Sequence, residues 1–145
     1  MNPATIFQIC STIALIGWLL LIIVSPFWYG VDKFIISIII TIFALVYAWL
    51  IATNFYFGDI QKFNSLEGVM SLFTNPATVT AGWIHYLAFD LMTGLWIKNN
   101  SLKHGIGHGL VIPCLLLTFM FGPIGLLLYL LLRWLITKQY FAQNY

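Results

Sequence analysis

The chain has 145 residues, of which 61% are hydrophobic and only 7% are charged, and its mean hydropathy is +0.97. These values exclude an ordinary water-soluble domain and indicate an integral membrane protein surrounded by lipid. The formal net charge of +2 comes from scattered residues that form no basic run. Nothing in the sequence therefore points to nucleic acid as a partner.

Four uncharged or nearly uncharged apolar runs follow one another along the chain. A helix needs about 20 apolar residues to cross the roughly 30 Å of hydrocarbon in a bilayer. Runs of this length cover residues 4–24, 34–53, 77–97 and 109–132. No Lys or Arg precedes the first run, so it lacks the positive start of a secretory signal, and we expect it to be retained. We predict one all-α transmembrane domain over residues 1–145, a bundle of four membrane-spanning helices.

The first and third runs begin with the same four letters, NPAT, at residues 2–5 and 75–78. Asn is a good helix N-cap, and Pro is tolerated at the first helical position because its missing N–H costs nothing there. The repeat is what two related helix hairpins would show, and a shared need for N-capping explains it equally well. The second run is rich in Ile and uncharged, which indicates scaffold.

The connection between the second and third runs, residues 54–75, contains Asp59, Lys62 and Glu67. A connection of this length without its own secondary structure is unusual in a compact domain. We therefore expect a short amphipathic helix lying at the membrane interface.

The fourth run contains the letters FGPIG at residues 121–125. Pro123 removes one helical hydrogen bond and frees a carbonyl, so we predict a kink within a continuing span. A packing kink between Gly122 and Gly125 is the structural alternative.

The basic residues do not indicate which way the chain is oriented in the membrane. With four spans, they divide equally between the two sides, so the positive-inside rule gives a tie. Lys33, Lys98 and Lys103 lie on one side, and Lys62, Arg133 and Lys138 lie on the other.

The third run carries two ionisable residues, His85 and Asp90. Such residues cost a few kcal/mol or more near the middle of a bilayer, so they usually mark a site or a pathway. Five residues apart on a regular helix, they point about 140° apart, and only a π-bulge would align them. A carboxylic acid and an imidazole supply the general acid and base that isomerise a polar group on a lipid-soluble substrate. Alternatively, each residue bonds to a neighbouring helix and only holds the bundle together.

An antiparallel arrangement of the third and fourth runs would bring His85 and Asp90 near polar groups of the fourth. The resulting pocket would include the carbonyls freed around Pro123. Our candidates for contact with a substrate are Asn75, Thr78, Trp83, Tyr86, Cys114, Thr118 and Pro123. Neither Cys10 nor Cys114 indicates a disulfide, because both lie within apolar runs and behave there as small hydrophobes.

His104 and His108 have the HxxxH spacing that places two ligands on one helical face. The glycines of HGIGHG disfavour a helix there, and solvated histidines at the interface are the alternative. Together with His85 and Asp90 they would form a His/carboxylate set suited to zinc or iron. We expect no cofactor, and a metal ion or a bis-histidine haem stays open.

Two segments resemble a known family: LFTNPATVTAGWIHYLAFDLMTGLWI, followed by HGLVIPCLLLTFMFGPIGLLLYLLLR. They are similar to the small membrane family named for abscisic-acid deficiency four, whose plant members are neoxanthin synthases. The resemblance covers nearly the whole chain. Its most specific parts are Trp83-x-His85 with Asp90-Leu91, and Phe121-Gly122-Pro123 with Gly125.

The resemblance implies conversion of violaxanthin to neoxanthin, in which an epoxide opens and an allene forms without redox change. This reaction needs a proton donor at the epoxide oxygen and a base for a polyene hydrogen, roles that His85 and Asp90 could fill. The chain lacks a plastid transit peptide, so we expect a multi-pass protein of the bacterial cytoplasmic membrane. Its ligand would be a carotenoid or another isoprenoid lipid.

Other functions stay open at this point. One is a non-catalytic pigment- or lipid-binding protein, or an assembly subunit of a larger membrane complex. Another is a metal- or haem-dependent redox protein. A transporter ranks last, because four short spans would have to form a homodimer to enclose a path.

Overall fold

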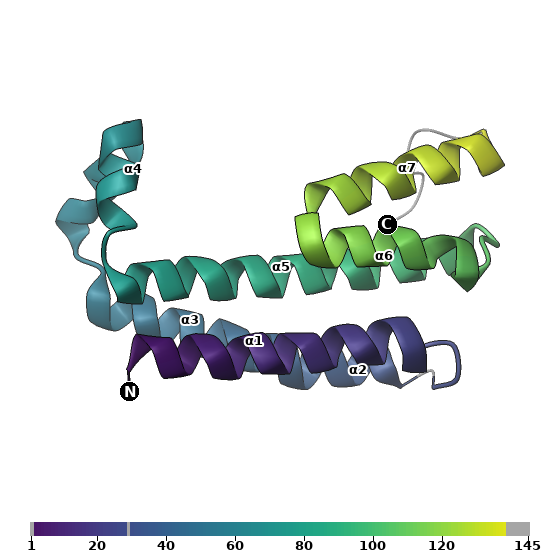
Figure 1. Cartoon of the computed structure of the whole chain (residues 1–145), viewed down its shortest axis with the longest axis horizontal. Coiled ribbons are helices and arrows are strands. Elements are labelled where there is room, and N and C mark those ends of the chain that lie inside the picture. The colour runs from purple at the N-terminus through teal and green to yellow at the C-terminus, as the bar shows by residue number, and fades with distance from the viewer. Residues whose placement is uncertain (1, 29, 139–145) are drawn as a thin grey trace.

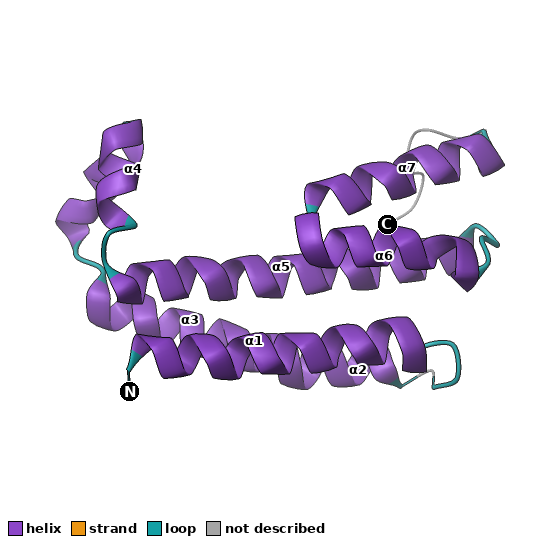
Figure 2. Ribbon diagram, viewed as in Figure 1, coloured by secondary structure: helices purple, strands orange, loops and turns teal. Residues whose placement is uncertain are grey.

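A computed structural model describes residues 2–28 and 30–138 of the chain. All regular elements in these two ranges are helices (Figure 2). Three long helical rods lie side by side, and a pair of shorter helices packs beside the second half of the third rod (Figure 1). The predicted all-α class is therefore confirmed.

The first two rods correspond to the first two apolar runs. The first consists of α1 (Pro3–Leu19) and a π-helical continuation, η1 (Leu20–Val24). The second joins α2 (Val31–Phe34), the π-helical η2 (Ile35–Ile40) and α3 (Thr41–Asn54). Within the described ranges, Pro3–Val24 and Val31–Asn54 are the helical segments that are both long and apolar enough to cross a membrane, and they suggest membrane association.

The third rod, α5 (Pro76–Lys103), is the element on which the others pack. Its 28 residues extend about 42 Å. As predicted, Asn75 caps it, with its Oδ1 accepting a hydrogen bond from the Ala77 N–H at 2.8 Å. The helix is regular throughout, and the π-helical segments lie in the first two rods instead. No bulge therefore brings His85 and Asp90 into register.

The connection from α3 to α5 contains two short helices, η3 (Phe57–Asn64, a 3₁₀-helix) and α4 (Leu66–Leu72). The predicted helical structure is confirmed, but it is divided at Ser65, whose backbone is extended. The Ser65 Oγ caps α4 by accepting from the Gly68 N–H at 3.1 Å. The two helices pack on each other and stand off one end of the rods (Figure 1).

The fourth apolar run does not form the single kinked span that we predicted over residues 109–132. It forms two helices, α6 (His108–Phe121) and α7 (Pro123–Thr137), that fold back on each other. Gly122 makes the reversal with φ 37° and ψ −90°, a conformation open to glycine. Each helix is only about 21–23 Å long, shorter than the hydrocarbon layer. The predicted four-span bundle thus becomes three rods and a helix hairpin.

Polar groups hold the end of this hairpin against α5. The Asn100 Oδ1 accepts hydrogen bonds from the Tyr129 hydroxyl at 2.6 Å and from the Arg133 Nη1 at 3.2 Å. At the same end, the Lys98 Nζ pairs with the Asp32 Oδ1 at 2.9 Å and so joins α5 to α2. Arg133 therefore lies at the same end as Lys98. Our assignment of these two residues to opposite sides is wrong, because the chain reverses at Gly122.

Candidate functional site

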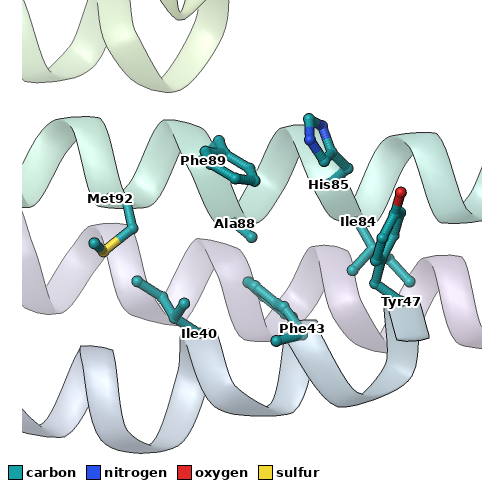
Figure 3. A pocket seen from close by; sticks show the side chains of 9 residues that line it. Ile40, Phe43, Tyr47, Ile84, His85, Ala88, Phe89 and Met92 are labelled. Carbon is teal, nitrogen blue, oxygen red and sulfur yellow. The ribbon is translucent and has the colours of Figure 1, made fainter. Parts of the chain in front are cut away.

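An apolar groove runs between α3 and α5 and encloses about 220 Å³ (Figure 3). Apart from the imidazole of His85 and the hydroxyl of Tyr47, its side chains are hydrocarbon or thioether. The lining residues are Ile40, Phe43, Ala44, Tyr47, Ile84, His85, Ala88, Phe89 and Met92. Such a groove fits an apolar molecule that carries few polar groups.

His85 is an exposed residue of α5 that lines this groove. Its ring centroid lies 4.5 Å from that of Phe89 and 5.8 Å from that of Tyr47. Among residues 2–28 and 30–138, no group forms a hydrogen bond with the imidazole. Neither ring nitrogen is therefore occupied by a partner within the described protein.

The groove continues in both directions along α5. Toward the helix start, a second cavity of about 220 Å³ shares Tyr47 and His85 with it and extends to Thr78. Toward the helix end, a third of about 410 Å³ shares Phe89 and Met92 with it and reaches Trp96 beside α7. We call the three together the α5 track. It spans about 27 Å of helix from Thr78 to Trp96, and His85 lies near its middle.

Asp90 lies away from the α5 track, at the turn between α6 and α7. A Cβ on Gly122 would lie 2.7 Å from the Asp90 Oδ1, so the carboxyl group sits directly over this glycine. Within the described part of the chain, the Asp90 Oδ2 is buried and has no hydrogen-bond partner. The Tyr86 hydroxyl is also nearby, and it lies 3.4 Å from each of the Phe119 and Met120 carbonyl oxygens.

The structure thus separates the two predicted catalytic residues, as expected for positions five apart on a regular helix. Thr118 and Cys114 lie deep in the hairpin, where the Thr118 Oγ1 donates to the Cys114 carbonyl at 2.8 Å. Close approach of Gly125 covers them, and Pro123 is exposed at the start of α7. These hairpin residues are on the Asp90 side, and His85 is not part of a pocket with them.

The remaining predicted contact residues have different neighbours. Trp83 faces α1, where its Nε1 donates to the Ser11 Oγ at 2.9 Å and its ring lies 5.1 Å from that of Phe7. Asn75 and Thr78 line a separate cavity of about 200 Å³ beside η3 and α4. Of the predicted set, His85 and Thr78 line the α5 track.

The cavity at Asn75 and Thr78 also contains an ion pair. The Lys62 Nζ lies 2.7 Å from the Asp59 Oδ1, and the Tyr56 N–H donates to the Asp59 Oδ2 at 3.0 Å. The hydrogen bond from Lys62, followed by the one from the Tyr56 backbone, holds the pKa of the Asp59 carboxyl below its usual value. We call this cavity the polar cup; its lining residues are Asn54, Tyr56, Asp59, Lys62, Ser71, Leu72, Asn75 and Thr78.

His104 and His108 do not form the predicted metal-binding pair on one helix. His104 ends α5 and His108 begins α6, and Gly105 lies between them with φ 66°. The His108 Nε2 is 2.8 Å from the Ile22 carbonyl oxygen, to which it must donate a proton. Within residues 2–28 and 30–138, no three His, Cys, Asp or Glu side chains gather as a metal site. The four-residue set with His85 and Asp90 is therefore not assembled.

The profile of the family described as ABA DEFICIENT 4-like matches residues 5–129. The chain belongs to this family. The match extends from α1 into α7, so it includes His85, Asp90 and the turn at Gly122 in this ABA DEFICIENT 4-like chain. No curated protein and no solved structure matches it.

Tyr47 was not among the residues predicted to form a site in this ABA DEFICIENT 4-like chain. This residue lies in the charge-free run that we interpreted as scaffold, yet it borders both cavities that contain His85. Tyrosine is often found where its ring is buried among apolar groups and its hydroxyl meets a polar group. This preference is the feature of the sequence that could have identified Tyr47. The ion pair of the polar cup was missed as well, since Asp59 and Lys62 were interpreted only as charges of an interfacial helix.

Proposed function

We propose that this protein is a membrane enzyme that rearranges a carotenoid or a related isoprenoid lipid by acid/base catalysis. One observation carries the proposal: the imidazole of His85, with no hydrogen-bond partner among the described residues, lies midway along an apolar, aromatic-lined track. Aromatic and aliphatic walls suit a long, flat conjugated hydrocarbon. Membership of the ABA DEFICIENT 4-like family supports the same substrate class.

The proposed arrangement has the three rods crossing the bilayer and the α6–α7 hairpin entering and leaving on one side. Backbone that departs from helix at membrane depth is tolerated where protein buries it. Gly122 fits this condition, because it is buried and the Asp90 side chain covers it. The α5 track then opens toward lipid, and a hydrophobic substrate enters it sideways without passing through water.

In the proposed reaction, one histidine performs both proton transfers because they occur in sequence. The His85 imidazolium donates a proton to the epoxide oxygen while a carbon–oxygen bond breaks and leaves a carbocation. The neutral imidazole then removes a hydrogen from the adjacent chain carbon, and the electrons of that carbon–hydrogen bond form the second double bond of an allene. His85 ends protonated as it began, so no oxidant, reductant or cofactor is consumed.

Asp90 has a different role in this proposal. It lies over Gly122 and outside the α5 track, so it does not reach a molecule that lies against His85. We assign it to positioning the α6–α7 turn, and through that turn the α7 side chains that border the third cavity, Leu126 and Leu130.

Reconstituted vesicles loaded with a hydroxylated epoxy-carotenoid test the proposal. Chromatography with mass detection should show an isomer of unchanged mass and an allenic absorption spectrum. We expect His85→Gln to lower turnover by at least about 100-fold, the usual loss on removing a general acid/base. His104→Gln is the matched control, because His104 lies at the end of α5 and far from the track. Turnover by His85→Gln at the rate of the unmodified protein would end the proposal.

A non-catalytic carotenoid-binding protein is the second candidate. It is favoured by the observation that the α5 track contains His85 but not Asp90. The predicted acid/base pair is therefore not assembled there. In this case the same vesicles would return the pigment unchanged, and His85→Gln would still bind it. The first experiment therefore separates the two functions.

A further inference from the structure

The polar cup adjoins the first cavity of the α5 track. Leu72 and Thr78 line the cup and also the first cavity of the track. Tyr47 and His85 then lead into the central groove. A single extended molecule can therefore have one end among polar side chains and the remainder among aromatic and aliphatic ones.

The charges of the cup indicate what kind of end group it holds. Asp59 and Lys62 are paired at 2.7 Å and cancel each other, so the cup offers no net positive charge to a phosphate or a carboxylate. Glu67, which lies four residues before the cup residue Ser71 on α4, adds a negative charge to this helix. An anionic head group would be repelled or unpaired here, whereas a neutral hydrogen-bonding group would not.

Hydrogen bonds within the protein leave several polar groups of the cup available, and two of them lie at the start of α5. The Ser71 Oγ donates to the Gly68 carbonyl at 2.6 Å, and the Asn75 Oδ1 is used in capping α5. In the described part of the chain, neither the Thr78 hydroxyl nor the Asn75 side-chain amide N–H forms a hydrogen bond. A hydroxyl group on a ligand could therefore donate a hydrogen bond to the Thr78 hydroxyl oxygen.

We propose that the polar cup binds the uncharged, hydroxylated end of a long isoprenoid lipid whose hydrocarbon chain lies along the α5 track. This inference rests on the proposed function, which identifies the ligand whose hydrocarbon chain lies against His85. It fixes the direction of the ligand, with its hydroxyl at the start of α5. It also places the reacting group close to that end, because Thr78 and His85 are separated by about 10 Å of helix rise.

Binding of three probes to the purified protein in phosphatidylcholine nanodiscs tests the inference, with quenching of tryptophan fluorescence as the readout. Zeaxanthin carries a hydroxyl on each end ring, β-carotene is the same polyene without hydroxyls, and undecaprenyl phosphate has an anionic end. We expect zeaxanthin to bind about fivefold tighter than β-carotene, the worth of one additional hydrogen bond, and undecaprenyl phosphate to bind weakest.

Thr78→Val keeps the side-chain shape and removes a hydroxyl that the described protein groups do not use, so folding should be unaffected. We expect it to abolish the preference for zeaxanthin. Thr93→Val is the matched control at the far end of the track, where the Thr93 hydroxyl already donates to the Phe89 carbonyl at 2.8 Å. This variant should keep the preference.

Equal binding of zeaxanthin and β-carotene by the unmodified protein would overturn the inference, as would tighter binding of undecaprenyl phosphate. An unchanged preference in Thr78→Val would also overturn it, even if the vesicle assay shows turnover that depends on His85. Conversely, a preference that Thr78→Val removes, in a protein that converts no substrate, would uphold the cup and reject the proposed enzyme.

Discussion

Gly122 meets two constraints that a larger residue would violate together. Its φ of 37° is unfavourable for residues with a Cβ, and a Cβ there would lie 2.7 Å from the Asp90 Oδ1. We expect Gly122→Ala to destabilise the fold by about 1–3 kcal/mol from backbone strain, with the contact adding to this cost. Thermal unfolding in detergent measures the change.

Gly109→Ala is the control for this substitution, since a Cβ at Gly109 meets nothing within 4 Å. A double-mutant cycle with Asp90→Ala separates the two costs, because truncating Asp90 removes the contact and leaves the strain. Gly122→Ala should therefore cost less in the Asp90→Ala background. An equal cost in both backgrounds would show that the carboxyl group does not press on this turn.

Asp90→Asn tests the assignment of this residue to positioning. The amide has nearly the same volume as the carboxyl group, so it should hold the turn and keep turnover within about tenfold of the unmodified protein. His85→Gln should lose at least about 100-fold in the same vesicles. A loss of turnover in Asp90→Asn as large as that in His85→Gln, with normal thermal stability, would place Asp90 in the chemistry.

At the scale of single elements, η3 depends on the ionised form of Asp59. The hydrogen bond from Lys62, together with that from the Tyr56 N–H, lowers the pKa of this carboxyl. A lowered pKa means that the contribution to stability is present above the unfolded-state pKa of about 3.9 and is lost as the pH falls through the folded-state value. Residues 57–64 should therefore stay ordered at pH 5 and loosen below about pH 4.

Carboxyl carbon chemical shifts measured by NMR check this pH dependence. Asp59 should titrate below the model-peptide value, and Lys62→Met should raise its midpoint by removing the largest cause of the shift. A midpoint for Asp59 that Lys62→Met leaves unchanged would contradict the role given to the ion pair.

Local signals in the sequence predicted some elements well. The Asn-Pro starts at residues 2 and 75 predicted two helix N-termini because capping depends on neighbouring residues alone. Run length likewise predicted the first two rods. The letters FGPIG, however, are compatible with both a kink and a reversal. The reversal depends on long-range contacts, among them those of Tyr129 and Arg133 with Asn100, which hydropathy does not contain.

The same distinction applies to the candidate site. His85 and Asp90 were recognisable because ionisable groups are costly in an apolar helix, and the helical angle between them correctly predicted that they face different neighbours. Tyr47 was not recognisable, because its proximity to His85 arises from the packing of α3 on α5. The sequence separates these two residues by 38 positions and contains no local pattern that joins them.

At the scale of the whole molecule, the hairpin redistributes the charges. With α7 returning beside α5, the start of α2, the end of α5 and the end of α7 lie at one end of the rods (Figure 1). From the bounds of these elements, five of the six Lys and Arg residues are at this end, and Lys62, in η3, is at the other. The five are Lys33, Lys98, Lys103, Arg133 and Lys138. The predicted tie between the two sides therefore rested on the wrong path for the fourth run.

This asymmetry predicts the orientation of the protein in the proposed membrane arrangement. Because Lys and Arg are enriched on the cytoplasmic side, the end that contains Lys98 and Lys103 should face the cytoplasm, and the polar cup should face the opposite side. A membrane-impermeant maleimide applied to intact cells should label Gln61→Cys directly and Leu102→Cys only after permeabilisation. Both positions are exposed, and the two native cysteines are buried and should not react. Labelling of Leu102→Cys in intact cells would reverse the orientation, and a hydroxylated ligand held in the cup would then have its polar end on the cytoplasmic side.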